Sequence, residues 1–189
     1  MRPLPGRLVL LGHPVSHSLS PAFQNAALRR AALPLRYEAL DVPPESLDAT
    51  LDLLVGEGTW GNVTIPHKER VARRCTRVTE IANRVGAVNT FWVEDGALVG
   101  DNTDVGGFLE LMASTSPDLD RAKPVAVLGA GGAAAATIAA LEQAGFGDIR
   151  IHGRTSARAA ALCARFTAAR AVNDLAAVVR GATLVVNAT

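Results

Sequence analysis

The sequence predicts an α/β fold in two domains, and three observations lead to this prediction. Short apolar segments typical of buried strands alternate with segments of helical periodicity through the first half of the chain. A polar connection with Ser-Thr-Ser-Pro and scattered charges, residues 114–123, separates this half from a second series of strands and helices. The second series opens with a strand, a glycine-rich turn and an alanine-rich helix. We expect a three-layer α/β domain with a mostly parallel sheet over residues 1–105, and a second α/β domain over residues 106–189.

The composition is that of an ordinary globular protein. Of the 189 residues, 49% are hydrophobic and 20% charged, and 19 basic and 18 acidic residues give a net charge of +1. No overall field therefore favours nucleic acid or an anionic membrane. The two cysteines, Cys75 and Cys163, have no metal-ligand spacing, and the apolar run at residues 8–11 is far shorter than a signal or membrane-spanning segment. We expect a cytoplasmic monomer or homodimer without a metal ion.

In the first domain, each of three strand candidates is followed by a loop and a helix. The strands are expected at residues 8–11, 36–40 and 60–65. Ser20 and Pro21 suit the N-cap and the first position of a helix to about Leu33. Pro66 suits the first position of the third helix, whose first turn contains Lys68. Because strands and helices alternate, these strands are expected to be parallel.

An antiparallel hairpin is expected after the third helix. Residues 87–93 and 97–100 have strand character, and Asp95-Gly96 between them is a preferred hairpin turn. A helix containing Phe108 and Met112 follows. The hairpin is expected to close the first domain.

Polar side chains gather where the expected parallel strands end. Ser18 and Ser20 follow the first strand, and Thr64 and Lys68 follow the third. Ligands of parallel sheets bind outside the carboxyl ends of the strands, and hydroxyl groups beside a helix N-terminus suit a carboxylate or a phosphate. Ser20 is also explained as an N-cap. A lysine in a first helical turn gains nothing from the helix dipole, so we expect Lys68 to have a role other than helix stability.

Asp104 ends a polar run, residues 101–104, that belongs to a different loop. Capping of the following helix is one explanation for this carboxylate. If Asp104 and Lys68 meet, they form a candidate proton-transfer pair, because a neighbouring carboxylate keeps an ammonium group charged and oriented.

Other polar residues are not expected to act directly. The histidines are not assigned to catalysis, and no two of them have metal-ligand spacing; they are His13, His17, His67 and His152. His67 has no evident partner. Asn62 is interpreted as part of the turn.

The second domain carries a dinucleotide-binding pattern. A buried strand at residues 124–128 runs into Gly129-Ala130-Gly131-Gly132-Ala133-Ala134, which fits G-x-G-x-x-A and opens a helix. Glycines at these positions let a pyrophosphate approach the backbone at the helix N-terminus. The remaining elements expected are a strand at 149–152, a helix to about Arg170, a helix at 174–180 and a strand at 183–187. The three strands with their helices would form one β-α-β-α-β half of a doubly wound Rossmann fold.

The residues after the second strand of this domain favour NADP over NAD. An NAD site usually places a carboxylate there for the ribose 2′-hydroxyl. This sequence has instead Gly153-Arg154-Thr155, followed by Arg158. Two guanidinium groups can form the bidentate pairs that a 2′-phosphate accepts. The alternative is that Arg154 and Arg158 form a solvated helix face.

Five motifs, taken together, resemble the shikimate dehydrogenase family in order and spacing over essentially the whole chain. They are residues 17–21, 62–68, 86–90, 100–104 and 129–133. The family reduces 3-dehydroshikimate to shikimate with NADPH, in the pathway to chorismate and the aromatic amino acids. The resemblance therefore implies a shikimate-binding domain over residues 1–105 and an NADP-binding domain over residues 106–189.

The resemblance also implies roles for individual residues. Ser18 and Ser20 would bind the substrate carboxylate, and Thr64 and Asn89 would bind ring hydroxyls. Lys68 and Asp104 would be the catalytic pair and would also contact the substrate. The glycine turn, residues 129–133, would bind NADP together with Arg154, Thr155 and Arg158.

The chain departs from the family pattern in three places. The segment 134–136 is all alanine where the family often has an arginine, and Gly153 stands where an asparagine usually precedes Arg154, so somewhat weaker phosphate binding is expected. The family also continues past Thr189. We therefore expect an incomplete nucleotide-binding domain and poor hydride transfer by these residues alone. Two alternatives stay open: a quinate/shikimate dehydrogenase, and a truncated module that binds shikimate or nucleotide without turnover.

Overall fold

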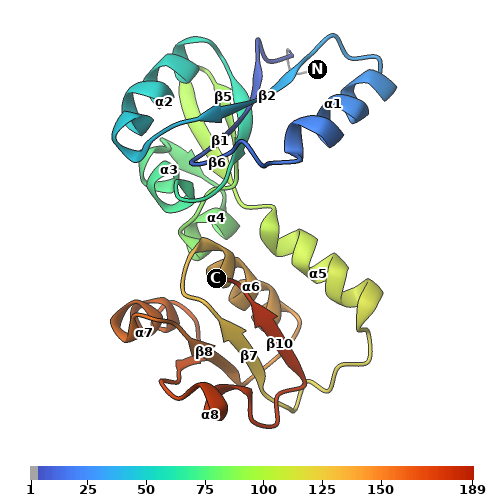
Figure 1. Cartoon of the computed structure of the whole chain (residues 1–189), viewed down its shortest axis with the longest axis vertical. Helices are drawn as coiled ribbons and strands as arrows, with labels where there is room; N and C mark the ends of the chain where they lie inside the picture. Colours follow the sequence, from blue (N-terminus) through green and yellow to red (C-terminus); the bar gives the residue numbers. More distant parts are fainter. Residues whose placement is uncertain (1–3) are drawn as a thin grey trace. The chain divides into compact units, whose positions relative to one another are not determined.

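The chain folds into two compact α/β units. The structure is a computed structural model that describes residues 4–189 (Figure 1). Unit 1 comprises the chain up to Asn83 together with Ala87–Asn102, and unit 2 comprises Arg84–Gly86 and Thr103–Thr189. Both units contain a sheet with helices, so the expected α/β class is confirmed. None of the helices in residues 4–189 has the length and apolar character that crossing a bilayer requires.

Unit 1 is built on a six-stranded sheet in the order β2-β1-β3-β5-β6-β4. The strands are β1 (Leu8–Gly12), β2 (Tyr37–Asp41), β3 (Trp60–Val63), β4 (Arg77–Val78), β5 (Thr90–Glu94) and β6 (Ala97–Asp101). Strand β1 pairs in parallel with β2 and β3, as expected. Strands β5 and β6 form the expected antiparallel hairpin, in which Asp95 and Gly96 take positive φ values of 53° and 71°.

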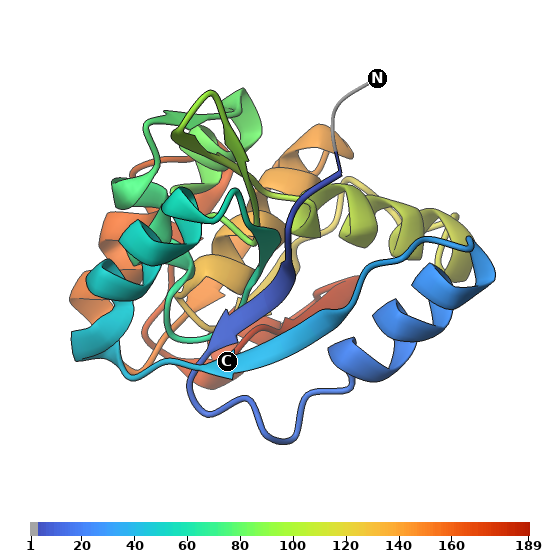
Figure 2. The ribbon, with the colours of Figure 1, turned by 90° about the horizontal axis from the view of Figure 1, so that it is seen from above.

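Alternation along β1 produces the three layers of unit 1. Val9 and Leu11 point into a buried cluster that includes leucines of α2 (Leu47–Gly56) and Val71 of α3 (Lys68–Arg74). Leu10 belongs to a second cluster with Val15 and Tyr37, against which Leu28 of α1 (Ser20–Arg30) packs. Helices α1 and α2 accordingly lie on opposite sides of β1 and β2 (Figure 2). Because β1 is covered on both faces, a continuous apolar run is what this strand needs.

Several helix boundaries differ from those expected, because local hydrogen bonds decide them. Helix α1 ends at Arg30 and not near Leu33. Ala32 takes a left-handed conformation with φ of 51°, and the N–H of Leu33 donates to the carbonyl of Leu28 at 3.0 Å. These are the features of a helix-terminating Schellman motif. Strand β4 and helix α4 (Glu80–Val85), both short, were not predicted.

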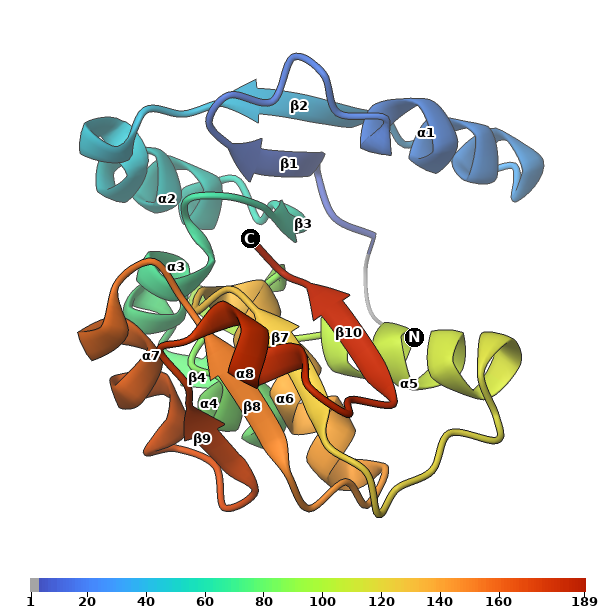
Figure 3. The same cartoon turned by 60° about the horizontal axis from the view of Figure 1, so that its bottom comes forward.

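Unit 2 contains a four-stranded parallel sheet in the order β10-β7-β8-β9 (Figure 3). The strands are β7 (Val125–Leu128), β8 (Ile149–His152), β9 (Ala169–Ala171) and β10 (Leu184–Asn187). The helices are α5 (Asp104–Thr115), α6 (Gly132–Gln143), α7 (Ser156–Cys163) and α8 (Leu175–Val179). Helices α6 and α8 lie on opposite faces of this sheet (Figure 3).

The prediction of a helix to Arg170 was wrong, because α7 ends at Cys163 and β9 follows it. The three-strand half was expected to end with the strand at 183–187, but this was wrong, because β9 follows β8 and the half consists of β7, β8 and β9. Strand β10 lies on the other side of β7, so the strand order reverses between β7 and β10. In doubly wound sheets, this reversal marks the crevice in which ligands bind.

Residues Arg84–Gly86 are held within unit 2 by an arginine–phenylalanine cluster. The guanidinium of Arg84 pairs with the carboxylate of Glu142, whose side chain is 7% exposed. The guanidinium of Arg165 donates to the carbonyl of Arg84 at 2.6 Å. Both guanidiniums lie over the ring of Phe166, at 5.9 Å and 6.0 Å from its centroid. This cluster attaches a short segment of the α4 region to unit 2.

Candidate active site

The predicted substrate residues of unit 1 all lie on segments at one edge of the sheet. Ser18 and Ser20 follow β1, Thr64 and Lys68 follow β3, and Asn89 directly precedes β5. Strands β1 and β3 are parallel, so their carboxyl ends share an edge, and β5 begins at that edge because it runs antiparallel to β3. The topology therefore gathers the five predicted residues of this unit.

Backbone hydrogen bonds join the segment after β3 to the end of β1. The N–H of Thr64 donates to the carbonyl of Leu11 at 2.8 Å, and the N–H of His13 donates to the carbonyl of Ile65 at 3.0 Å. Gly12 lies between these bonds, and a Cβ on it would lie only 2.4 Å from Cγ2 of Thr64. The close approach of Thr64 to β1 therefore requires glycine at this position.

A second set of backbone bonds joins the segment 87–89 to the same region. The N–H of Val63 donates to the carbonyl of Asn89 at 2.8 Å, and the N–H of Val88 donates to the carbonyl of Lys68 at 2.9 Å. The N–H of Asn89 donates in turn to the carbonyl of Asp101 at 3.0 Å. Asn89 and Lys68 are thus tied through their backbones to the same strand–turn–helix connection.

The two serines have roles in α1 that differ from those expected. The helix begins at Ser20, with Leu19 as its N-cap, so the interpretation of Ser20 as the N-cap was wrong. The hydroxyl of Ser18 accepts the N–H of Ser20 at 3.2 Å, and the N–H of Ser18 donates to the carbonyl of Val15. Ser18 therefore serves the start of the helix, and both serine residues are partly exposed.

Pro66 lies in a turn and not at the first position of a helix. The N–H of His67 donates to the carbonyl of Thr64 at 3.0 Å, which closes a four-residue turn around Pro66. Helix α3 then begins at Lys68. Lys68 therefore stands in the first turn as expected, at the end of the helix where the dipole does not favour a cation.

His67 has a clear structural role, contrary to the expectation that it lacks a partner. It is 1% exposed, and its Nε2 lies 2.6 Å from the carbonyl oxygen of Val42. His13 and His152 contact Asp41 and the carbonyl of Val172, respectively. Within residues 4–189, no group of three or more His, Cys, Asp or Glu side chains is arranged to hold a metal ion.

Asn62 is a strand residue whose side chain belongs to a partly buried hydrogen-bond network, so its interpretation as turn structure was wrong. Its Oδ1 accepts the hydroxyl of Tyr37 at 2.8 Å. Its Nδ2 donates to Oγ1 of Thr90 at 3.0 Å and to the carbonyl of Asn89 at 3.3 Å. Sequence reasoning missed Tyr37 and Thr90, although Thr90 belongs to the motif at residues 86–90.

Asp104 belongs to unit 2, where it is the first residue of α5. The preceding Thr103 is the N-cap and makes no side-chain capping bond. A carboxylate in a first helical turn interacts favourably with the helix dipole. The alternative that Asp104 caps this helix was therefore wrong, because Thr103 is the N-cap, although the position of Asp104 still suits the helix dipole.

The glycine turn of unit 2 connects β7 to α6 as predicted. Gly129 has a φ of 127°, and a Cβ on it would lie 2.4 Å from the carbonyl oxygen of Ala188. Gly131 is the N-cap of α6, and a Cβ there would meet no atom within 4 Å. The first of these glycines is required by packing, whereas the second borders open space at a helix N-terminus.

The predicted phosphate residues follow the neighbouring strand. Leu128 of β7 pairs with His152 of β8, so the glycine turn and residues 153–158 leave the sheet side by side. A Cβ on Gly153 would lie 3.2 Å from Cβ of Ala130, so the departure from asparagine permits close contact between these two turns. Arg154 and Arg158 are exposed, and Thr155 between them is the N-cap of α7.

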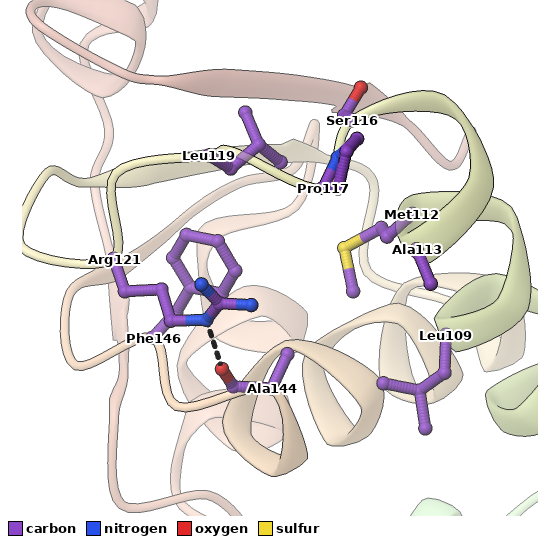
Figure 4. Close-up of a pocket in the computed structure, with 9 residues that line it drawn as sticks. All are labelled: Leu109, Met112, Ala113, Ser116, Pro117, Leu119, Arg121, Ala144 and Phe146. Carbon is purple, nitrogen blue, oxygen red and sulfur yellow. Dashed lines mark hydrogen bonds between the residues drawn. The ribbon is translucent and has the colours of Figure 1, made fainter.

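Two cavities formed by residues 4–189 contain none of the predicted site residues. One, of about 440 Å³, lies within unit 2 between α5 and the segment 116–121 (Figure 4). Arg121 lies at this cavity over the ring of Phe146 and donates from Nε to the carbonyl of Ala144 at 2.8 Å. The other, of about 490 Å³, lies within unit 1 and is lined by Trp60 and Trp92.

Two family models match the chain. A model described as shikimate dehydrogenase substrate binding domain matches residues 10–91, and one described as shikimate / quinate 5-dehydrogenase matches residues 110–189. A curated shikimate dehydrogenase (NADP(+)) of Mesorhizobium japonicum is 43% identical over 182 residues, which cover 94% of this chain. The chain spans 65% of the length of that relative.

Solved structures show the same relationship. Shikimate dehydrogenase from Aquifex aeolicus is 37% identical, with a TM-score of 0.89 over 97% of this chain and 68% of that one. Shikimate 5-dehydrogenase from Thermus thermophilus, in complex with NADP(H) and shikimate, is 42% identical, with a TM-score of 0.84 and the same coverage. On sequence and on fold, the chain belongs to the shikimate dehydrogenase family.

Proposed function

We propose that the protein catalyses the NADP-dependent, reversible reduction of 3-dehydroshikimate to shikimate, a step of chorismate and aromatic amino acid biosynthesis. The observation that carries this proposal is the common sheet edge that holds Ser18, Ser20, Thr64, Lys68 and Asn89. The named activity of the Mesorhizobium relative and the ligands of the Thermus structure support it. In this proposal, the domain of residues 1–105 binds shikimate and that of residues 106–189 binds NADP.

The side chains at this edge suit a polyhydroxylated carboxylate. The hydroxyls of Ser18 and Ser20 can donate to the substrate carboxylate near the N-terminus of α1, where the helix dipole favours an anion. Thr64 and Asn89 can exchange hydrogen bonds with ring hydroxyls. Asp104 is assigned as a further acceptor for a ring hydroxyl.

Lys68 and Asp104 are assigned as the catalytic pair. Reduction of the C3 carbonyl builds negative charge on its oxygen, and the ammonium of Lys68 can stabilise this charge and supply the proton. Asp104 would keep the amine charged and oriented. In the reverse direction, the neutral amine of Lys68 would accept the proton of the C3 hydroxyl.

The cofactor assignment fits the residues of unit 2. The open space beside Gly131 suits a pyrophosphate at the N-terminus of α6, and Gly129 permits the close packing of the turn that leads to it. The exposed guanidiniums of Arg154 and Arg158, on either side of Thr155, suit a 2′-phosphate. Bound NADPH would supply the hydride for the carbonyl carbon.

Replacement of Lys68 tests the proposal. Lys68→Ala should lower kcat for shikimate oxidation by about 10²-fold or more, with a smaller effect on shikimate affinity, because general acid–base catalysis typically contributes 10²–10⁴-fold. Lys123→Ala removes the only other lysine of the chain, which is exposed and lies 3.9 Å from Asp120, and serves as the control. Unchanged turnover in Lys68→Ala would refute the assignment.

Two alternatives remain to be separated from this function. Because the chain spans 65% of the length of its curated relative, it is a candidate for a module that binds without turnover. Calorimetric binding of shikimate with no NADP reduction at excess shikimate would support that alternative. The family model named for both substrates makes quinate the other alternative, and equal or higher kcat/KM for quinate would favour it.

A further inference from the structure

Asn89 is held by a chain of hydrogen bonds that begins on the other side of β1. We propose that Tyr37, Asn62 and Thr90 are positioning residues that fix the side-chain amide of Asn89, so that its Nδ2 is the end that donates to a ligand oxygen. The inference rests on the proposed function, in which Asn89 binds a ring hydroxyl. It specifies which partner donates in that hydrogen bond: Asn89 donates and the ligand oxygen accepts.

The four residues come from one region of the sheet of unit 1. Tyr37 lies on β2 and Asn62 on β3, the two strands that flank β1, and Asn62 pairs with Thr90 at the start of β5. Tyr37 is 4% exposed and packs against Leu10. Burial raises the pKa of Tyr37 to about 12, so its hydroxyl keeps its proton at neutral pH. Tyr37 is therefore available as a hydrogen-bond donor.

The carbonyl of Asn89 determines the orientation of the Asn62 amide. A carbonyl oxygen only accepts hydrogen bonds, so the group of Asn62 that lies 3.3 Å from it must be Nδ2. The other end of the amide, Oδ1, then lies 2.8 Å from the Tyr37 hydroxyl and accepts its proton. A flipped amide would place its Oδ1 against the carbonyl oxygen of Asn89, so the bond to that carbonyl would be lost.

The hydroxyl of Thr90 links the orientation of the Asn62 amide to that of the Asn89 amide. Its Oγ1 accepts a proton from Nδ2 of Asn62 at 3.0 Å, so its own proton is available for another acceptor. That acceptor is Oδ1 of Asn89, also at 3.0 Å. The chain of donors thus runs from Tyr37 through Asn62 and Thr90, and it ends on the oxygen of the Asn89 amide.

An Asn89 amide whose oxygen accepts from Thr90 has Nδ2 as its donor end. The residue is 8% exposed, and in such a buried position a rotated amide would leave polar atoms with the wrong partners. The matching ligand atom is therefore an acceptor, such as the lone pair of a hydroxyl or carbonyl oxygen. Pre-orientation of this donor would improve affinity without any contact between Tyr37 or Asn62 and the ligand.

A pair of Thr90 variants tests the inference in the 189-residue chain. Thr90→Val keeps the shape of the side chain but removes the hydroxyl, whereas Thr90→Ser keeps the hydroxyl. Loss of one hydrogen bond predicts a roughly 3- to 10-fold weaker shikimate affinity for Thr90→Val in calorimetry. Thr90→Ser should stay within about 2-fold of the wild-type chain, since it keeps the same donor. Equal affinities of the Val and Ser variants would overturn the inference.

A double-mutant cycle distinguishes positioning from a general loss of structure. In the Asn89→Ala background, Thr90→Val should change shikimate affinity by less than about 2-fold, because its effect acts through the missing amide. The same loss in both backgrounds would contradict the proposal. If Thr90→Val does not fold, Tyr37→Phe takes its place in the cycle, with the same two outcomes.

An NMR measurement separates this inference from the proposed function. The side-chain NH2 signals of Asn89, identified by their absence in Asn89→Ala, should be one sharp pair in the free chain and in Thr90→Ser. In Thr90→Val they should broaden or split. If the signals change in this way but the chain does not bind shikimate, the proposed function is refuted and the positioning role is not. Sharp signals in all three chains would overturn the positioning role even where shikimate binds.

Discussion

Gly12 is predicted to be essential for both the stability of unit 1 and the position of Thr64. A Cβ on Gly12 would lie 2.4 Å from Cγ2 of Thr64 and 2.5 Å from Cγ1 of Val15, about 1 Å closer than an ordinary contact. Relief of this overlap requires a shift of the site residue Thr64 or of the core residue Val15. Overpacking of this kind costs about 1–3 kcal/mol, which exceeds the gain of about 0.4–1 kcal/mol from a less flexible unfolded chain.

Gly12→Ala should therefore lower the free energy of unfolding of unit 1 by about 1–2 kcal/mol. Gly56→Ala is the matched control, because a Cβ at Gly56 meets no atom within 4 Å. It should be neutral or stabilising by up to about 1 kcal/mol. Urea unfolding followed by tryptophan fluorescence reports on unit 1 alone, since the two tryptophans, Trp60 and Trp92, both lie in it.

The same variant should weaken the binding of shikimate, because the displaced Thr64 is an assigned ligand for a ring hydroxyl. Calorimetry with the Gly12 and Gly56 variants measures this effect. If Gly12→Ala were as stable as Gly56→Ala and bound shikimate equally well, the argument from close packing at Thr64 would be refuted.

Two further predictions concern unit 2. Arg154→Ala should weaken binding of NADPH far more than that of NADH, because only NADPH carries the 2′-phosphate. Fluorescence titration measures both affinities, and Arg36→Ala on unit 1 is the control. Equal losses of NADPH and NADH affinity would remove the role assigned to Arg154. The hydrogen bond from Arg170 lowers the pKa of Asp148. The ionised Asp148 therefore stabilises the folded unit above about pH 4, the usual range of the aspartate pKa. This stabilisation is lost as the pH falls through the lowered pKa. Asp148→Asn should remove this part of the acid dependence, as measured by hydrogen exchange in β8 and β9 between pH 3 and about pH 6; an unchanged acid dependence would contradict the prediction.

The sequence predicted those elements whose signal is local. Strands β1 and β7 are short apolar runs, strand β8 alternates buried isoleucines with polar residues, and the Asp95-Gly96 turn carries its own backbone preference. Strand β9 was missed because Ala169–Ala171 contains alanine and arginine, which are not typical strand residues. Its strand conformation depends on pairing with β8.

The candidate site also contains features that the sequence predicted and features that it did not. The location of Thr64 and Lys68 at a strand end followed from sheet topology, which the order of elements already contains. The contacts of Asn62 and His67 could not be predicted from the order of elements, because their partners lie on other elements. These partners are the Tyr37 hydroxyl on β2 and the carbonyl of Val42, which directly follows β2. Such partners become visible only when the register of the sheet is known.

The attachment of Arg84–Gly86 to unit 2 has a consequence for dissecting the protein. The chain passes between the units at residues 83–84, 86–87 and 102–103, so neither unit is one uninterrupted stretch of sequence. An expression fragment that starts at Thr103 would leave Glu142, with 7% exposure, without the guanidinium of Arg84. A fragment that stops at Asn102 would retain residues 84–86 but lose the Phe166 ring on which Arg84 lies. Separately produced halves would each need redesign at this segment.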